Sequence, residues 1–96
     1  MNVRIKKSAL EQIEQIADYI TNEIKMPETA LNYTDKLIEF GLSLGKYYKA
    51  YPLCNNPKLA SHALRCATFD KKWIFAYRIG KRSVIIHHLI WGGKLN

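Results

Sequence analysis

The sequence contains few cysteines and no long apolar run. Its 96 residues include two cysteines, Cys54 and Cys66, whose number and spacing fit neither a zinc cluster nor a disulfide scaffold. We therefore expect both to be reduced thiols of a cytosolic protein. No stretch reaches the roughly 18 apolar residues that a membrane span needs, and residues 1–7 contain charges where a signal peptide would be apolar. These absences predict a cytoplasmic protein that does not span a membrane and needs no metal ion or other cofactor.

Acidic residues are almost missing from the second half of the chain. The whole sequence has 15 Lys and Arg, 8 Asp and Glu, and a net charge of +7. Residues 1–44 contain five bases and seven acids, a net charge of −2, whereas residues 45–96 contain ten bases and one acid, a net charge of +9. A positive field of this kind usually serves a polyanion or an acidic partner. The alternative is a solvated basic surface that only confers solubility.

The spacing of apolar residues predicts one α+β domain over residues 1–96. Residues 2–6 alternate as in a short half-buried strand. Two segments with apolar residues at three- and four-residue intervals predict antiparallel helices, the first capped by Ser8 with Glu11 and the second beginning at Pro27 and ending near Gly45. Three strands are expected after an irregular stretch, over residues 61–69, 73–79 and 82–90. The expected fold is an N-terminal strand, a helical hairpin and a three-stranded antiparallel meander that form one small twisted sheet.

Two-residue loops at Asp70-Lys71 and Gly80-Lys81 would determine which side chains share a face of the sheet. They place residue 68 opposite 73 and residue 77 opposite 84. The face expected to cover the helices is apolar: Leu64, Cys66, Trp73, Phe75, Tyr77, Ile79, Val84 and Ile86. The face expected to stay open, because no helix remains to cover it, is small, mixed and basic: Ala63, Arg65, Ala67, Lys72, Ile74, Ala76, Arg78, Ser83, Ile85 and His87. His88 is then a core histidine, although a slip of one residue would exchange the two faces.

Several short motifs occur in a characteristic order along the chain. They are Pro27-Glu28-Thr29-Ala30, Tyr51-Pro52-Leu53, Ala63-Leu64-Arg65, Trp73-Ile74-Phe75-Ala76-Tyr77-Arg78, Val84-Ile85-Ile86 and Leu89-Ile90-Trp91-Gly92-Gly93-Lys94. Together they resemble the RelE/ParE superfamily of bacterial toxins over nearly the full chain. The resemblance implies the toxin of a type II toxin–antitoxin module (a plasmid stabilisation or addiction module). Such a toxin arrests growth by acting on ribosome-bound mRNA or on DNA gyrase, and a cognate antitoxin neutralises it.

The residues for RNA cleavage are only partly present. Such cleavage needs a base for the 2′-hydroxyl, cations for the phosphate and an acid for the leaving oxygen. The positions at which related nucleases have an arginine hold Phe69 and Ile74, and the C-terminal Arg and Tyr of those nucleases are absent. The remaining catalytic candidates are Arg65, His87 or His88, and Lys94. Whether the protein is a ribosome-dependent endoribonuclease or a non-nucleolytic, ParE-like toxin stays open.

Four further residues are candidates for contact with the target or the antitoxin: Lys72, Arg78, Arg82 and Trp91. Two other functions are compatible with the same charge. One is a non-toxic basic module that binds nucleic acid, and the other is an inactive family member that only binds the antitoxin.

Overall fold

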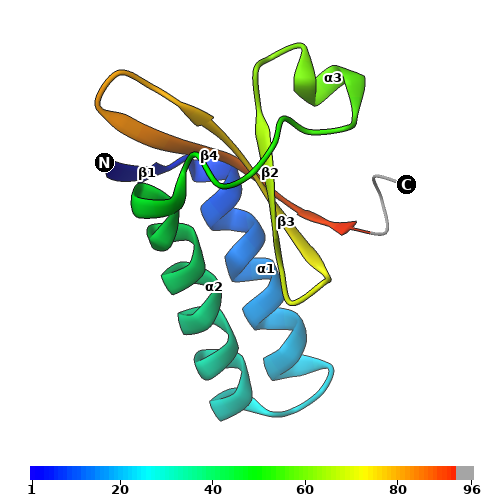
Figure 1. Ribbon diagram of the computed structural model, residues 1–96. Helices are drawn as coiled ribbons and strands as arrows, with labels where there is room; N and C mark the ends of the chain where they lie inside the picture. Colours follow the sequence, from blue (N-terminus) through cyan, green and yellow to red (C-terminus); the bar gives the residue numbers. More distant parts are fainter. Residues whose placement is uncertain (93–96) are drawn as a thin grey trace.

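The computed structural model describes residues 1–92, which form an α+β fold of one mixed sheet and a helical hairpin (Figure 1). The elements are β1 (Asn2–Ile5), α1 (Lys7–Asn22), α2 (Pro27–Tyr47), α3 (Pro57–Ala60), β2 (Arg65–Phe69), β3 (Trp73–Ile79) and β4 (Ser83–Trp91). The strand order is β1-β4-β3-β2, with β1 parallel to β4 and the other pairs antiparallel. The predicted order of strand, helical hairpin and meander is therefore confirmed, and α3 is an addition.

The two long helices follow the apolar spacing of the sequence. α1 buries Ala9, Ile13, Ile16 and Ile20, and α2 buries, among others, Ala30, Leu37 and Leu44. These side chains form one core with residues of the sheet, including Phe75, Tyr77 and Ile86. Pro27 is the first residue of α2, as predicted.

The predicted helix ends are wrong at two places. Ser8 does not cap α1, because the helix already begins at Lys7, and its hydroxyl instead donates to the backbone oxygen of His87 at 2.9 Å. Gly45 does not end α2, which continues to Tyr47. The backbone of Met1 passes so close to Gly45 that a side chain there would meet the Met1 carbonyl oxygen. The glycine therefore serves close packing rather than helix termination.

The predicted hairpin registers are also wrong. The β2–β3 loop has three residues, with Asp70 and Lys71 both at positive φ, so that Phe69 pairs with Trp73. This slip of one residue places Arg65 opposite Tyr77, on the face that packs on the helices. In the second hairpin residue 84 pairs with Ile79 rather than with 77, and a β-bulge interrupts the ladder between residues 76 and 77.

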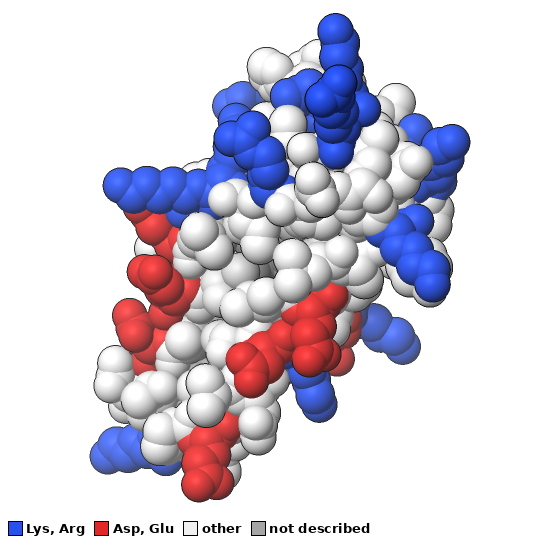
Figure 2. Space-filling model, turned by 90° about the vertical axis from the view of Figure 1, so that its left-hand side faces the viewer, with Lys and Arg blue, Asp and Glu red and all other residues white. Residues whose placement is uncertain are grey.

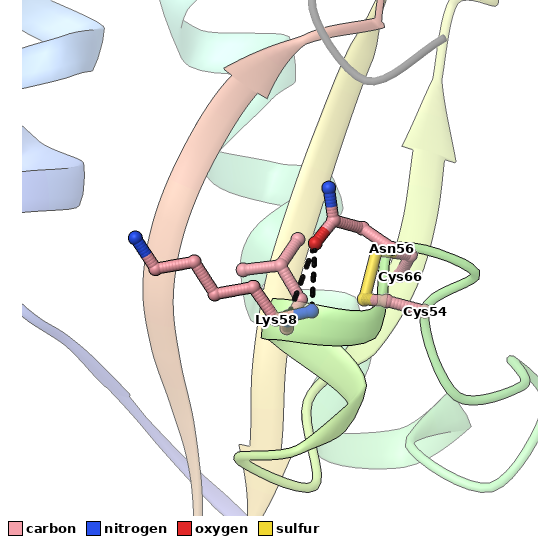
Figure 3. Close-up of a disulfide and its surroundings, with 5 residues drawn as sticks. Cys54, Asn56, Lys58 and Cys66 are labelled. Carbon is pink, nitrogen blue, oxygen red and sulfur yellow. Dashed lines mark hydrogen bonds between the residues drawn. A yellow bond between two sulfur atoms is a disulfide. The ribbon is translucent and has the colours of Figure 1, made fainter.

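The face opposite the helices is not bare, contrary to the prediction. Residues 54–64, which we call the roof segment, fold back over it and include α3. Cys54 and Leu64 are buried against Ala76 of β3, with Leu59, Cys66 and Ile90 packed around them. A disulfide between Cys54 and Cys66 joins the roof segment to β2 (Figure 3). The expectation of two reduced thiols is therefore wrong, because the fold brings their Cα atoms to within 4.9 Å.

Candidate functional site

Charge is separated along the molecule. Six of the eight acidic residues lie on α1 and α2, whereas Lys and Arg side chains gather over the end of the molecule that contains the sheet (Figure 2). The six acids on the helices are Glu11, Glu14, Asp18, Glu28, Asp35 and Glu39. The excess positive charge of the second half of the sequence is thus presented by the sheet and the roof segment.

A depression of about 510 Å³ lies where the roof segment meets the sheet. We call it the basic pocket. Its lining residues are Lys6, Lys58, Leu59, His62, Leu64, Arg78, His87 and His88. None of the described residues that line it is acidic. Six side chains that are cationic or can become so therefore share one hollow with no carboxylate to balance them.

Three parts of the chain build the basic pocket. Lys6 follows β1 and is held there because its backbone N–H donates to the carbonyl of Ile86 at 3.0 Å. Arg78 is an exposed residue of β3 opposite Ile85. His87 lies in β4 at the β-bulge, where the ladder shifts between the pair Tyr77–Ile86 and the pair Ala76–His88.

The roof segment contributes the remaining polar lining. The Asn56 side chain caps α3 by accepting from the backbone N–H groups of Lys58 and Leu59, at 3.0 and 3.3 Å. Figure 3 shows the Lys58 side chain running from α3 in the direction of β4. His62 lies in the turn that follows α3. The disulfide and the cap together hold Lys58 and His62 beside the sheet.

His87 is the electrostatic centre of the pocket. Burial, and next the positive charges of Lys6 and Arg78, lower the pKa of its imidazole below the usual 6.5, with smaller contributions from His88 and His62. These effects favour the neutral form of the imidazole at pH 7. Its Nε2 atom is buried and has no hydrogen-bond partner. This nitrogen is either an unsatisfied donor or an unsatisfied acceptor, depending on the tautomer, and buried polar atoms are seldom left so.

Of the residues predicted from the sequence, the structure brings His87 and Arg78 together in the basic pocket. Arg65 lies on the other face of the sheet, where its Nη1 donates to the carbonyl of Tyr51. Lys72 and Arg82 are exposed near the two hairpin loops, and Trp91 is exposed at the end of β4. Lys94 lies outside the described residues.

Three lining residues were missed by the sequence analysis, and a fourth was misplaced. Lys6 was expected only as part of the first strand. Lys58 was expected in the irregular stretch, and His62 in the strand over residues 61–69. The Asn56-Pro57 pair, in the stretch that was expected to be irregular, is a signal for the start of a helix. His88 is exposed rather than part of the core, because the β-bulge changes the alternation of side chains along β4.

Within residues 1–92, no three His, Cys, Asp or Glu side chains lie close enough together to hold a metal ion. No helix in that range has the length and apolar character needed to cross a membrane.

The arrangement of a helical hairpin on one face of a β1-β4-β3-β2 sheet defines a ParE-like fold. A chain of the solved structure of the chromosomal ParDE TA (toxin–antitoxin) system from P. aeruginosa matches this chain with a TM-score of 0.80. The match covers 95% of both chains at 17% sequence identity. No family model and no curated protein matches the sequence. The resemblance to the RelE/ParE superfamily is thus confirmed at the level of the fold.

Proposed function

We propose that the protein is the toxin of a type II toxin–antitoxin module. Such a toxin arrests growth by acting on ribosome-bound mRNA or on DNA gyrase, and a cognate antitoxin neutralises it. The observation that supports this most is the likeness over 95% of the chain to a chain of a ParDE system. The sheet end of the molecule, with its excess of Lys and Arg, is the surface through which both the target and the antitoxin would bind.

The charge of the sheet end favours an acidic antitoxin segment. Residues 45–92 contain nine of the basic residues and a single acid, Asp70. An acidic segment laid across this surface would be attracted at long range and would match it in charge at close range. The exposed side chains of Lys72, Arg82 and Trp91 are available for such contacts. A contact role of this kind also suits Arg65, which lies away from the basic pocket.

Of the two targets, the pocket chemistry favours RNA. A neutral imidazole beside three cationic side chains suits abstraction of a 2′-hydroxyl proton, with the cations stabilising the charge that develops on the phosphate. His87 would be the base, and Lys6, Lys58 and Arg78 the cations. Lys94 stays a candidate for a further cation near the leaving oxygen.

Expression in a bacterial host tests the proposal. Induction of the chain alone should arrest growth, and co-expression of an antitoxin from a neighbouring reading frame should restore it. Codon-phased cuts in mRNA, abolished by His87→Ala, would support the nuclease target, whereas trapped gyrase–DNA breaks would support gyrase. Lys36→Ala, at an exposed position of α2 outside the sheet end, is the control and should remain toxic. Normal growth with abundant folded protein would refute the toxin function, and salt-sensitive binding of nucleic acid without toxicity would support the simpler binding module.

A further inference from the structure

The roof segment has few side chains that hold it to the sheet. Within residues 54–64 the two end residues, Cys54 and Leu64, are buried, whereas none of residues 55–63 is. Between the two ends, Leu59 is half-buried and packs against the same apolar cluster. A segment with so few buried side chains opens at a low cost in free energy when its ends are not fixed.

The backbone of the roof segment also favours release. Ala63 has a φ of 58°, in a region that residues with a side chain seldom adopt, and it could relax if the segment left the sheet. A helix of four residues such as α3 is not stable in water on its own. The Cys54–Cys66 bond, which joins the segment to β2 (Figure 3), therefore has strong control over whether the segment stays closed.

The disulfide can be approached from solvent at one of its two cysteines. Cys54 is buried, whereas Cys66 is half-buried and lines a depression of about 480 Å³ together with Thr68 and Ile74. None of the described residues that line this depression is charged, so an incoming thiolate would meet no carboxylate there. Accessible disulfides are the ones that thiols reduce most readily, in contrast to fully buried structural bonds.

We infer that the Cys54–Cys66 disulfide is a reversible redox latch, which a dithiol opens and which controls the position of the roof segment. A thiolate of the dithiol attacks the Cys66 sulfur, the S–S bond breaks, and Cys54 leaves as a thiolate that takes up a proton. The second thiol of the reductant, after losing its proton, displaces Cys66, which is protonated in turn. The dithiol thereby becomes a disulfide, and the chain gains two thiols. A thiolate at Cys54 is unfavourable in the apolar cluster with Leu64 and Ala76, so its formation favours departure of the segment from the sheet.

The latch affects the basic pocket because Lys58 and His62 belong to the roof segment. Reduction would free both side chains from their place beside the sheet. Within the proposed function, the oxidised form is therefore the one with a complete basic pocket. The inference rests on that function for this consequence and for the compartment, since both proposed targets lie in the bacterial cytoplasm, where disulfides are mostly transient.

Hydrogen exchange of the full chain, read by mass spectrometry, measures release of the roof segment. The protein is purified without reductant and then treated with reduced thioredoxin, a protein dithiol. We expect two thiols per chain to become reactive to iodoacetamide while the chain stays folded. Deuterium uptake over residues 55–63 should become faster by about tenfold or more, at labelling times so short that β3 stays protected. Oxidised glutathione should re-form the bond and return the uptake to its starting rate.

Two variants separate release of the roof segment from a general loss of stability. Cys54→Ala/Cys66→Ala should show the fast uptake of the reduced chain and should not respond to thioredoxin. Gly45→Ala keeps the disulfide and crowds Met1 at a distance from the roof segment. Its roof segment should therefore exchange as slowly as that of the oxidised wild-type protein. Equally fast uptake in Gly45→Ala would show that the uptake reports only global stability, and would overturn the inference.

Three other results would also overturn it. Thiols that appear only in denaturant would identify a structural disulfide, and reduction without faster uptake would show that other contacts hold the roof segment. A bond that does not re-form would show that the latch is not reversible. Each of these results leaves the toxin function in place, because none of the measurements depends on growth. Normal growth on induction would remove the toxin function and leave the latch.

Discussion

Removal of the Cys54–Cys66 disulfide should lower the free energy of unfolding by about 3 kcal/mol. The bond connects the roof segment to β2 across a sequence separation of 12 residues, and a cross-link that closes a loop of this length restricts the unfolded chain by about that amount. The roof segment keeps other contacts, since the Cys54 N–H still donates to the Leu64 carbonyl at 2.9 Å. The protein should therefore fold without the bond, but with lower stability.

Thermal unfolding of the Cys54→Ala/Cys66→Ala variant measures this loss. In a domain of this size, 1 kcal/mol corresponds to a shift in Tm of about 4–8 °C, so that we expect a Tm about 12–24 °C below that of the oxidised protein. A reducing agent is the matched control: it should lower the Tm of the wild-type protein to that of the variant and leave the variant unchanged. Alanine is used because Cys54 is buried, and a serine hydroxyl there would be desolvated.

Two results would refute this reasoning. One is the titration of two free thiols in the folded protein purified without reductant. The other is a wild-type Tm that a reducing agent does not move. A smaller loss than expected would instead show that the unfolded chain is already compact or that the bond is strained in the fold.

Two further predictions concern packing and pH. Gly45→Ala should lower the free energy of unfolding, measured by urea denaturation, by about 1–3 kcal/mol, because the new methyl group would collide with the Met1 carbonyl and displace β1. Ala is otherwise the better helix former by about 1 kcal/mol. A variant as stable as the wild type would therefore contradict the close packing of Gly45 against Met1. His87, whose pKa is lowered in the folded state, is protonated first in the unfolded state as the pH falls through about 6.5. Stability should accordingly fall as the pH drops through about 6.5, and His87→Gln should flatten this fall. An unchanged pH profile in that variant would show that the imidazole is not shielded as described.

The helices and the order of the elements along the chain could be predicted because they depend on local patterns. Apolar residues at helical spacing identified α1 and α2, and Pro27 gave the start of α2. The alternation of side chains gave the three meander strands. None of these signals involves residues far apart in the sequence, and so the sequence alone was sufficient to place these helices and strands.

The registers could not be predicted because they depend on exceptions to local rules. Asp70 and Lys71 both adopt positive φ, which favours glycine, and so lengthen the first hairpin loop by one residue. The β-bulge at residues 76 and 77 then shifts β4. Each exception changes which face a side chain occupies, and this is why Arg65 was assigned to the wrong face.

Of the residues in the candidate site, only those whose positions follow from a single predicted strand could be predicted. His87 and Arg78 were identified from their positions in β4 and β3. Lys58 and His62 depend on the folding back of the roof segment, which a disulfide and a helix of four residues determine. A pair of cysteines does not reveal its own pairing, and a single helical turn leaves almost no periodic signal.

The parallel pairing of β1 with β4 has a consequence for synthesis on the ribosome. Among the described residues, β1 has its one sheet partner in β4, with Val3 opposite Val84 and Ile5 opposite Ile86. Translation proceeds from the N-terminus, and so β1 must wait unpaired until β4 has been made. Lys6 and His87 come to line the same pocket only then. A nascent polypeptide without β4 would thus have no complete basic pocket, and any activity that depends on this pocket would begin only after β4 leaves the ribosome.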